Sequence, residues 1–345
     1  VRIMAYISFQ PNDYFNTKLY TGNGSTQSIT GVGFQPDWVW TKKRNATCDH
    51  HIFDVIRGAT YKINSASTET SSADANTLTS FDSDGFSVGT NGCQNNSGDT
   101  FVSWNWKAGG AGSANTDGSI NSTVSVNQTA GFSIVSYTGT GANATVGHGL
   151  GVAPSMIITK SLAATQEWAV GTDALGWNKY LFLNEVSASQ SGSTYWQSTA
   201  PTNQVFSIGT AGPTNSSSAM IAYCFAEKKG FSKFGSYKSN NSTWGTFINC
   251  GFKPAFVLCK VTDTTTNDWT LLDSARDTYN VAGKRLYPNS SAVESEVARA
   301  DFLSNGFKLR GTGSDMNGPA GYGYFYMAFA EEPLVSSNGI PATAR

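Results

Sequence analysis

One pattern is written three times along this chain, and a repeat of this length constrains the fold more than any other feature of the sequence. Its clearest marker is a short apolar segment that begins with proline and ends with lysine: PDWVWTK, PSMIITK and PAFVLCK. The prolines and the lysines both recur at intervals of 118 and 100 residues: Pro36, Pro154 and Pro254, and Lys42, Lys160 and Lys260. We therefore expect the chain to contain three copies of one fold.

Further markers keep nearly the same spacing on either side of these segments. Tyrosines precede the three segments, and aspartates follow them after apolar runs: Tyr20, Tyr137 and Tyr237, and Asp54, Asp173 and Asp273. Each unit closes with TFVSWNWKA, AMIAYCFAE or YFYMAFAE, in which large side chains alternate. This alternation predicts a final strand with one face in the core.

Each copy is a series of short apolar runs separated by Gly, Asn, Ser and Thr turns, which is typical of antiparallel β-structure. The runs WVW, MII and FVL are apolar on consecutive positions and predict strands covered on both faces. We therefore expect an all-β fold of three tandem antiparallel β-sandwiches of the jelly-roll type. The one exception is residues 290–303, where Val293 and Val297 stand among charges with a spacing that permits a short helix.

The repeat also sets the expected domain boundaries. These are a first β-sandwich at 1–108, a linker at 109–122, a second β-sandwich at 123–228, a third at 229–333 and a C-terminal tail at 334–345. The linker has no large side chain over GGAGSANTDG, so it is expected to be flexible. Only Lys228, Lys229 and Gly230 separate the second and third copies, which should therefore be held close together.

Composition limits the partners of the chain. It has 345 residues with 23 basic and 24 acidic side chains, and this net charge of -1 gives no electrostatic footprint for nucleic acid. No apolar run reaches the length of a membrane span, so no membrane insertion is expected, and the N-terminus does not resemble a secretory signal. With 39% hydrophobic residues the chain should fold into a packed structure.

The sequence predicts neither a metal site nor a cofactor. The five cysteines are an odd number without a C-x-x-C pair, and we interpret them as buried free thiols. The acidic string at 82–85 could suit calcium, but the third copy has Leu303-Ser304-Asn305-Gly306 at the same place. Because only the turn-forming Asp-Gly or Asn-Gly pair is shared, a tight hairpin turn is the better interpretation.

Catalytic groups are scarce. The three histidines, His50, His51 and His148, form no known metal or nucleophile motif. The acid pairs Glu294 with Glu296 and Glu331 with Glu332 are expected to be solvated. We therefore predict a protein that is not an enzyme. A glycosidase needs only two carboxylates facing each other across a cleft, so a glycan-degrading enzyme remains an alternative.

The aromatic residues divide into shared and unshared ones. Trp38 and Trp40 align with other bulky residues and are expected in the core, and Trp168 and Trp269 align with each other. Four aromatics among turn residues have no aromatic equivalent in the other copies and are the candidates for contact with a ligand or partner: Trp177, Tyr195, Trp196 and Trp244. If these four gather on one exposed face, adhesion is favoured. The shared lysines are expected to end a buried strand.

Several ordered strings resemble one known family. They include YTGNGSTQSITGVGFQPDWVW, TAGFSIVSYTGTGANATVGHGLGVAPSMIITK, YCFAEKKGFSKFGSY and DFLSNGFKLR, and the resemblance runs from about Tyr6 to Pro333. The family consists of tandem-repeat proteins encoded by tailed bacteriophages, especially marine ones. The resemblance implies virion or tail-fibre-like proteins with concanavalin A-like lectin or jelly-roll folds, and it implies no catalytic residues.

Together these features predict a non-enzymatic structural protein on the outer surface of a tailed-phage virion, most simply a tail appendage that contacts host surface glycans. Neutral loops rich in hydroxyl and amide groups suit weak binding that many virion copies strengthen. The expected partners are other virion proteins of the tail or capsid, together with host surface carbohydrate. The alternative is a capsid decoration protein, a cement or head-fibre protein, that stabilises the shell without recognition.

Overall fold

The computed structural model describes residues 8–264, 266–335 and 341–343, and its regular structure is almost entirely antiparallel β-sheet. The helices of the described residues are single turns: η1 (Pro11–Asp13), α1 (Gly92–Asn95), α2 (Ser193–Trp196) and α3 (Gly212–Asn215). None of them has the length and apolar character that a membrane-spanning helix needs. The all-β class predicted from the sequence is confirmed.

The strands fall into three groups, one for each repeat, which we call unit 1 (8–108), unit 2 (109–228) and unit 3 (229–333). Unit 1 contains β1 (Phe15–Thr21), β2 (Gln27–Thr30), β3 (Trp38–Lys43), β4 (His51–Asp54), β5 (Tyr61–Asn64), β6 (Ser72–Ala73), β7 (Leu78–Asp82), β8 (Gly85–Val88) and β9 (Thr100–Trp106). Unit 2 contains β10 (Ser113–Asn115), β11 (Ser122–Asn127), β12 (Phe132–Thr138), β13 (Ala144–Gly147), β14 (Met156–Ser161), β15 (Ala169–Thr172), β16 (Lys179–Phe182), β17 (Gln190–Ser191), β18 (Val205–Ile208) and β19 (Ala219–Phe225). Unit 3 contains β20 (Ser232–Lys238), β21 (Trp244–Asn249), β22 (Phe252–Val261), β23 (Thr270–Asp273), β24 (Ala282–Arg285), β25 (Ser295–Leu303), β26 (Gly306–Arg310) and β27 (Gly323–Pro333).

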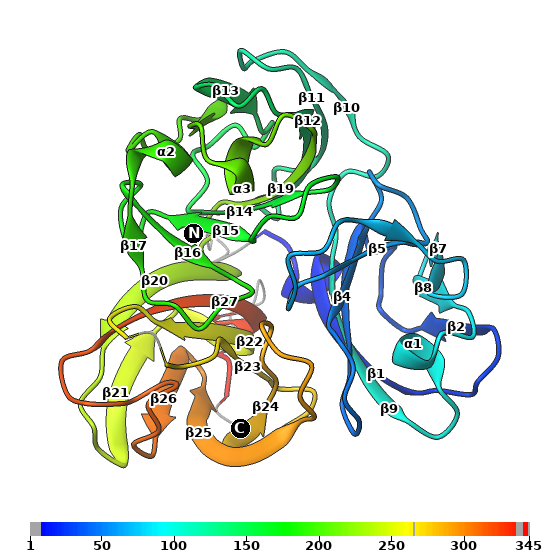
Figure 1. Cartoon of the computed structure of the whole chain (residues 1–345). Helices are drawn as coiled ribbons and strands as arrows, with labels where there is room; N and C mark the ends of the chain where they lie inside the picture. The colour runs from blue at the N-terminus through cyan, green and yellow to red at the C-terminus, as the bar shows by residue number, and fades with distance from the viewer. Residues whose placement is uncertain (1–7, 265, 336–340, 344–345) are drawn as a thin grey trace, which may run out of the picture.

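The three units share one strand order. Four strands of an inner sheet follow the same sequence in each unit: β1-β9-β3-β4, β12-β19-β14-β15 and β20-β27-β22-β23. An outer sheet lies over each of them: β2-β8-β7, β13-β18 and β21-β26-β25-β24. Within the described residues, no strand of one unit joins a sheet of another, and Figure 1 shows the units as three lobes around a common centre.

Both faces of each inner sheet are buried. One face packs against the outer sheet of its own unit, which gives three separate hydrophobic clusters. The opposite faces of all three inner sheets meet in one central core, where Trp38, Trp40 and Trp104 of unit 1 are fully buried together with side chains of units 2 and 3. The core positions predicted for Trp38 and Trp40 are therefore confirmed. The final strand of each unit, however, buries two faces rather than one, because the units close on one another.

The helix predicted within residues 290–303 does not form, since this stretch contributes β25 to the outer sheet of unit 3. β25 pairs with β24 on one side and with β26 on the other. Val293 and Val297 are both exposed, so their helical spacing does not mark a buried face. Sheet pairing outweighs a weak periodic signal here.

The flexible linker predicted at 109–122 is also wrong, because part of it is a strand of unit 2. β10 pairs with β11 and extends the inner sheet beyond β12. A Cβ atom at Gly109 would lie 2.5 Å from the carbonyl oxygen of Val126, so this glycine permits a close approach of two backbones. The small residues serve packing rather than mobility. The tail at 334–345 lies partly outside the described residues, and Val335 forms an isolated bridge with Pro341.

A further repeated residue, a buried asparagine that the sequence analysis did not identify, joins two loops of each unit by hydrogen bonds. Asn95, Asn215 and Asn317 are buried, and each donates its side-chain amide to the carbonyl of the glycine six residues before it. Each also accepts a backbone N–H from the loop that follows β1, β12 or β20. The aligned tyrosines donate to the carbonyl of the residue just before each asparagine: Tyr20, Tyr137 and Tyr237. The signal in the sequence is GTNGCQN, GTAGPTN and GTGSDMN.

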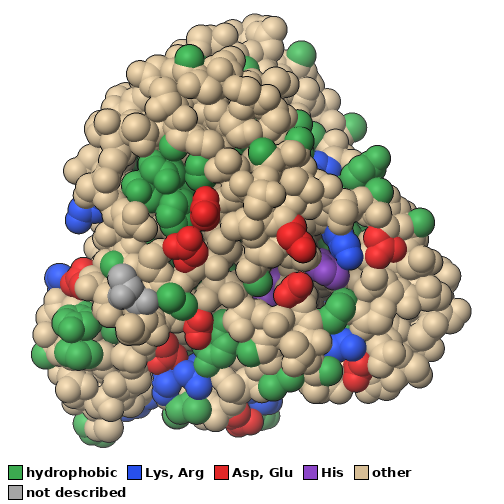
Figure 2. All heavy atoms as spheres, in the orientation of Figure 1, with side chains coloured by type: hydrophobic (Ala, Val, Ile, Leu, Met, Phe, Trp, Pro, Cys, Tyr) green, Lys and Arg blue, Asp and Glu red, His purple; other side chains and the backbone are tan. Residues whose placement is uncertain are grey.

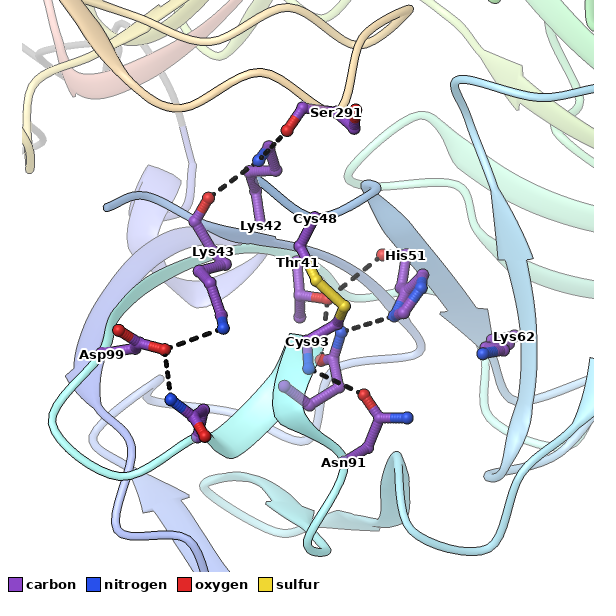
Figure 3. The surroundings of a disulfide bond; sticks show 12 residues. Thr41, Lys42, Lys43, Cys48, His51, Lys62, Asn91, Cys93, Asp99 and Ser291 are labelled. Atoms are coloured by element: carbon purple, nitrogen blue, oxygen red, sulfur yellow. Dashed lines mark hydrogen bonds and ion pairs between the residues drawn. A yellow bond between two sulfur atoms is a disulfide. The ribbon is translucent and has the colours of Figure 1, made fainter. Parts of the chain in front are cut away.

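The interpretation of all five cysteines as free thiols is wrong for two of them. Cys48 and Cys93 form a disulfide that joins the loop after β3 to α1, whereas the three other cysteines are free and buried: Cys224, Cys250 and Cys259. Figure 3 shows this bond beside Thr41 and His51, which both contact α1 through the Gln94 side chain. The pairing escaped the sequence because an odd cysteine count does not reveal which thiols meet.

Removing this disulfide is expected to destabilise the protein. Cys48 and Cys93 are 45 residues apart, and in the loop-closure model a crosslink of this span contributes about 4 kcal/mol. We expect the Cys48→Ser/Cys93→Ser double variant to unfold at lower urea concentration, with a loss of about 2–4 kcal/mol. Reductant should lower the stability of the wild type to the level of the variant and leave the variant unchanged. Equal stability of both proteins without reductant would contradict this.

The acidic string at 82–85 forms the predicted hairpin turn between β7 and β8, where Asp82 pairs with Gly85. The carboxylate of Asp84 accepts the backbone N–H groups of Gly31 and Gly33, at 2.9 and 2.6 Å. These bonds, led by the one from Gly33, lower the pKa of Asp84. The carboxylate thus fastens one loop of unit 1 to another.

Candidate functional site

The aligned lysines each lie one residue before the end of a buried strand, as expected, and they also join the units to each other. All three are fully buried, and each ammonium group donates to the carbonyl of its next neighbour in the chain and to a carbonyl of another unit. The bonds between units are Lys42 to Ser291, Lys160 to Thr68 and Lys260 to Val186. Unit 1 thus holds unit 3, unit 2 holds unit 1, and unit 3 holds unit 2, so the contacts form a closed ring. Burial lowers the pKa of each lysine to about 8.

A buried aspartate and arginine reinforce two of the three junctions. Asp273 accepts the indole N–H of Trp104 from unit 1 at 2.9 Å and pairs with Arg276 at 2.6 Å. The junction between units 1 and 2 has the same arrangement. There Asp54 pairs with Arg57 at 2.6 Å and accepts the hydroxyl of Tyr223 from unit 2 at 2.7 Å. Both aspartates are completely buried. Both carboxylates therefore stabilise the contact between two units.

The junction between units 2 and 3 has no aspartate at the corresponding strand position. Strand pairing places Thr172 opposite Met156, the position that Asp54 and Asp273 occupy opposite Trp38 and Phe256. The alignment of Asp173 with these aspartates is therefore wrong by one residue, and Asp173 is exposed. Its pKa is raised, chiefly because it is partly desolvated.

The three histidine side chains are buried and make hydrogen bonds within the fold. His50 accepts the indole N–H of Trp40 at 3.0 Å, and a ring nitrogen of His51 lies 2.7 Å from the side-chain amide of Gln94. Burial lowers the pKa of His51 to about 3 and lowers those of His50 and His148 as well. Among the residues the structure describes, no three His, Cys, Asp or Glu side chains are grouped so that they could hold a metal ion.

Two of the four candidate aromatics are buried, so the expectation that they contact a ligand is wrong. Trp177 is 7% exposed and Trp196 is fully buried, and their rings meet edge to face at 5.7 Å. They lie over Gly171, where a Cβ atom would come within 2.6 Å of the Trp196 ring. In the other units the same strand position carries Phe53 or Leu272. The unshared tryptophans therefore fill the space that a glycine leaves.

Tyr195 stands beside Trp196 on α2 and is half-buried, packed against the core of unit 2. Its ring stacks on Tyr180 at 3.6 Å and meets Phe182 edge to face, and both of these partners are buried. Burial raises the pKa of Tyr195, helped by its hydrogen bond to Tyr180 and by the nearby negative charge of Glu167 and Glu185. Figure 2 shows a hydrophobic patch with acidic side chains beside it over this part of unit 2. Only the accessible part of the Tyr195 ring is therefore free to contact the apolar face of a sugar ring.

Trp244 is the most accessible candidate, with 68% of its surface exposed on β21. Two cations of the neighbouring strand β26 lie against its ring, Lys308 at 4.9 Å and Arg310 at 4.7 Å. The sequence reasoning missed both cations. The repeat does single out Lys308, because units 1 and 2 carry Ser87 and Ser207 at the same strand position.

The four candidates do not gather on one face. Tyr195 belongs to unit 2 and Trp244 to the outer sheet of unit 3, while the remaining two are interior. Most of the face in Figure 2 consists of backbone and of side chains that are neither charged nor hydrophobic. Half-buried Tyr195 and exposed Trp244 are therefore separate features of a largely neutral surface.

Comparison with known proteins places the chain in a family but gives no function. A family model described as a domain of unknown function, DUF7483, matches residues 10–333. No curated protein and no solved structure matches the chain.

Proposed function

We propose that this chain, which belongs to the DUF7483 family, is a non-enzymatic structural protein on the outer surface of a tailed-phage virion. Within that assembly it acts as a tail-associated protein that contacts host surface glycans. The resemblance of its repeat strings to phage tail-fibre-like proteins supports the location. The proposal includes the finer fold assignment, in which each unit is a jelly-roll β-sandwich of the concanavalin A type.

One observation carries the non-enzymatic part of the proposal. The buried groups that catalysis could use are engaged in joining the units: the lysines Lys42, Lys160 and Lys260 and the aspartates Asp54 and Asp273. A ring closed by such bonds is a rigid platform. The surface also offers many hydroxyl and amide groups together with exposed Trp244 and half-buried Tyr195, which suit recognition.

The location is tested with gold-labelled antibodies against this chain on intact particles of the phage that encodes it. Label on the tail is expected, and antibody should slow adsorption to host cells. Label confined to the head would overturn the tail assignment in favour of a capsid decoration protein. Absence of label from the particle would overturn the virion role altogether.

The glycan contact is tested with purified chain and polysaccharide extracted from the host surface. We expect binding that Trp244→Ala or Tyr195→Ala weakens about tenfold. Tyr279→Ala should leave it unchanged, because Tyr279 is a highly exposed aromatic in the loop before β24, at the opposite edge of the outer sheet of unit 3 from the strand of Trp244. No binding by the wild type would contradict the adhesin role. New reducing ends in the polysaccharide would instead show a glycan-degrading enzyme.

A further inference from the structure

A groove between units 1 and 2 has a volume of about 670 Å³. One wall comes from unit 1 and includes Tyr61 and Ser71 of the β5–β6 hairpin. The other wall is the edge of the unit 2 sheet, where Thr123 and Ser136 stand on β11 and β12. Figure 1 shows β5 on one side and β10 and β11 on the other.

The unit 2 wall is an addition to the repeat. β12 corresponds to β1 and β20, which are the edge strands of their sheets, whereas β11 and β10 extend the unit 2 sheet by two strands. In register across these strands stand Ala114, Thr123 and Ser136. Ser136 flanks Val135 and Tyr137, which point to the core of unit 2, so the row of Ser136 points toward unit 1. The wall therefore serves a purpose that the shared fold does not require.

This wall presents polar groups that the protein itself leaves unused. Within the described residues, the hydroxyls of Thr123, Ser136 and Thr138 and the amide of Asn121 make no hydrogen bond to another protein group. Each can donate and accept. Thr123, Thr138 and Asn121 are exposed and Ser136 is half-buried, so a ligand in the groove can reach them.

The groove carries no uncompensated charge. Arg57 is its one side chain that is charged at neutral pH, and this guanidinium is paired with Asp54 and also donates to Ser71 and to the carbonyl of Tyr61. Arg57 thus holds the hairpin wall in position. No carboxylate lines the groove, so the paired acids of glycoside hydrolysis are missing from it. The cavities at the two other junctions differ, because acidic residues line both of them: Glu331 and Glu332, and Glu185 and Asp268.

An exposed aromatic ring completes the site. Tyr61 is 46% exposed, and its backbone is fixed by β6 and by the bond from Arg57. A flat ring opposite a row of hydroxyls is the combination that binds the apolar face of a sugar while bonding its hydroxyl groups. Binding sites also occur preferentially where two folded units meet.

We propose that the groove between units 1 and 2 binds a neutral oligosaccharide, one without carboxylate, phosphate or sulfate groups. The proposal rests on the glycan-binding function proposed above and names its ligand class, but it places the contact in a site separate from Trp244 and Tyr195.

The test is isothermal titration of the purified full chain with neutral hexaoses of glucose, mannose and galactose, and with an oligogalacturonate as the charged comparison. At least one neutral hexaose should bind, and the oligogalacturonate should bind no more than a tenth as tightly to the groove. Tyr61→Ala should weaken binding at least tenfold, and Thr123→Ala/Ser136→Ala about threefold to tenfold. Tyr61→Phe, which keeps the ring, should stay within threefold of the wild type.

Controls separate this proposal from the adhesin function. Tyr279→Ala should bind the hexaose like the wild type, and the unfolding temperature of every variant is measured to exclude loss of fold. If none of the neutral hexaoses binds, or if Trp244→Ala abolishes binding while Tyr61→Ala does not, the groove proposal is wrong. In the second case the chain still binds glycans, so the adhesin function survives without the groove.

Discussion

Replacing Asp273 by alanine is expected to lower the free energy of unfolding by about 3–5 kcal/mol. The carboxylate is fully buried between units 1 and 3, where it neutralises Arg276 and accepts the indole N–H of Trp104. Without it, the buried indole N–H of Trp104 loses its acceptor, and the buried guanidinium of Arg276 keeps only Glu294, at 3.1 Å, as a counter-charge. Asp54→Ala should cost a similar amount, because Arg57 and Tyr223 surround that carboxylate in the same way. Urea unfolding at neutral pH measures both losses.

Asp173→Ala is the matched control for these two variants. The sequence repeat aligns Asp173 with both buried aspartates, but strand pairing puts Thr172 at their position and leaves Asp173 exposed. We expect Asp173→Ala to stay within about 0.5 kcal/mol of the wild type, as exposed substitutions usually do. If all three alanine variants lost the same stability, the assignment of two reinforced junctions and one unreinforced junction would be wrong.

The repeat predicted the strands and the buried bulky residues but could not locate the one-residue shift at Thr172. Intervals in a sequence are insensitive to a single inserted loop residue, whereas a strand register is not, since a shift by one turns every side chain to the other face. The consequence is large at this position. Thr172 stands at the strand position where the other two units carry the aspartate that accepts from Trp104 or Tyr223.

The repeat was also misleading about the unshared aromatics. A residue absent from the other copies is free for recognition only if the core does not need it. Trp177 and Trp196 are needed, because Gly171 leaves room where the other units have Phe53 or Leu272. A glycine at an aligned strand position was the signal, but which distant side chain fills the space depends on the folded loops. Trp244, in contrast, is exposed and is not needed to pack a core.

The two sides of the neutral groove show a different limit of prediction. Thr123 stands just after the stretch read as a flexible linker, and a run of small polar residues gives no sign of its own that it will extend a sheet. Tyr61 and Ser136 come from different units, so only the arrangement of the units brings them to one cavity. Contacts between repeats lie outside what the pattern of one repeat can predict.

Replacing a ring-closing lysine by methionine is the second change with a large expected effect. Methionine fills the volume of the Lys160 stem but cannot donate to the carbonyls of Thr68 and Ser161. An unsatisfied buried carbonyl costs about 1–3 kcal/mol, so Lys160→Met should lose about 2–5 kcal/mol in urea unfolding. Lys179→Met, on the half-buried surface of the same unit, should lose less than about 0.5 kcal/mol.

The lysines also give the protein a characteristic pH dependence. Their pKa in the folded chain is about 8, below the value of about 10.4 in an unfolded chain. Between these values the unfolded chain binds more protons than the folded one, so this contribution makes stability rise from pH 8 toward pH 10. Above pH 10 the buried tyrosines act in the opposite direction, because burial raises the pKa of Tyr20 and Tyr137 and their ionisation favours the unfolded chain. Lys160→Met should therefore show a shallower rise between pH 8 and 10 than the wild type and the Lys179→Met control. A slope identical in all three proteins would mean that the ammonium of Lys160 is not held where burial lowers its pKa.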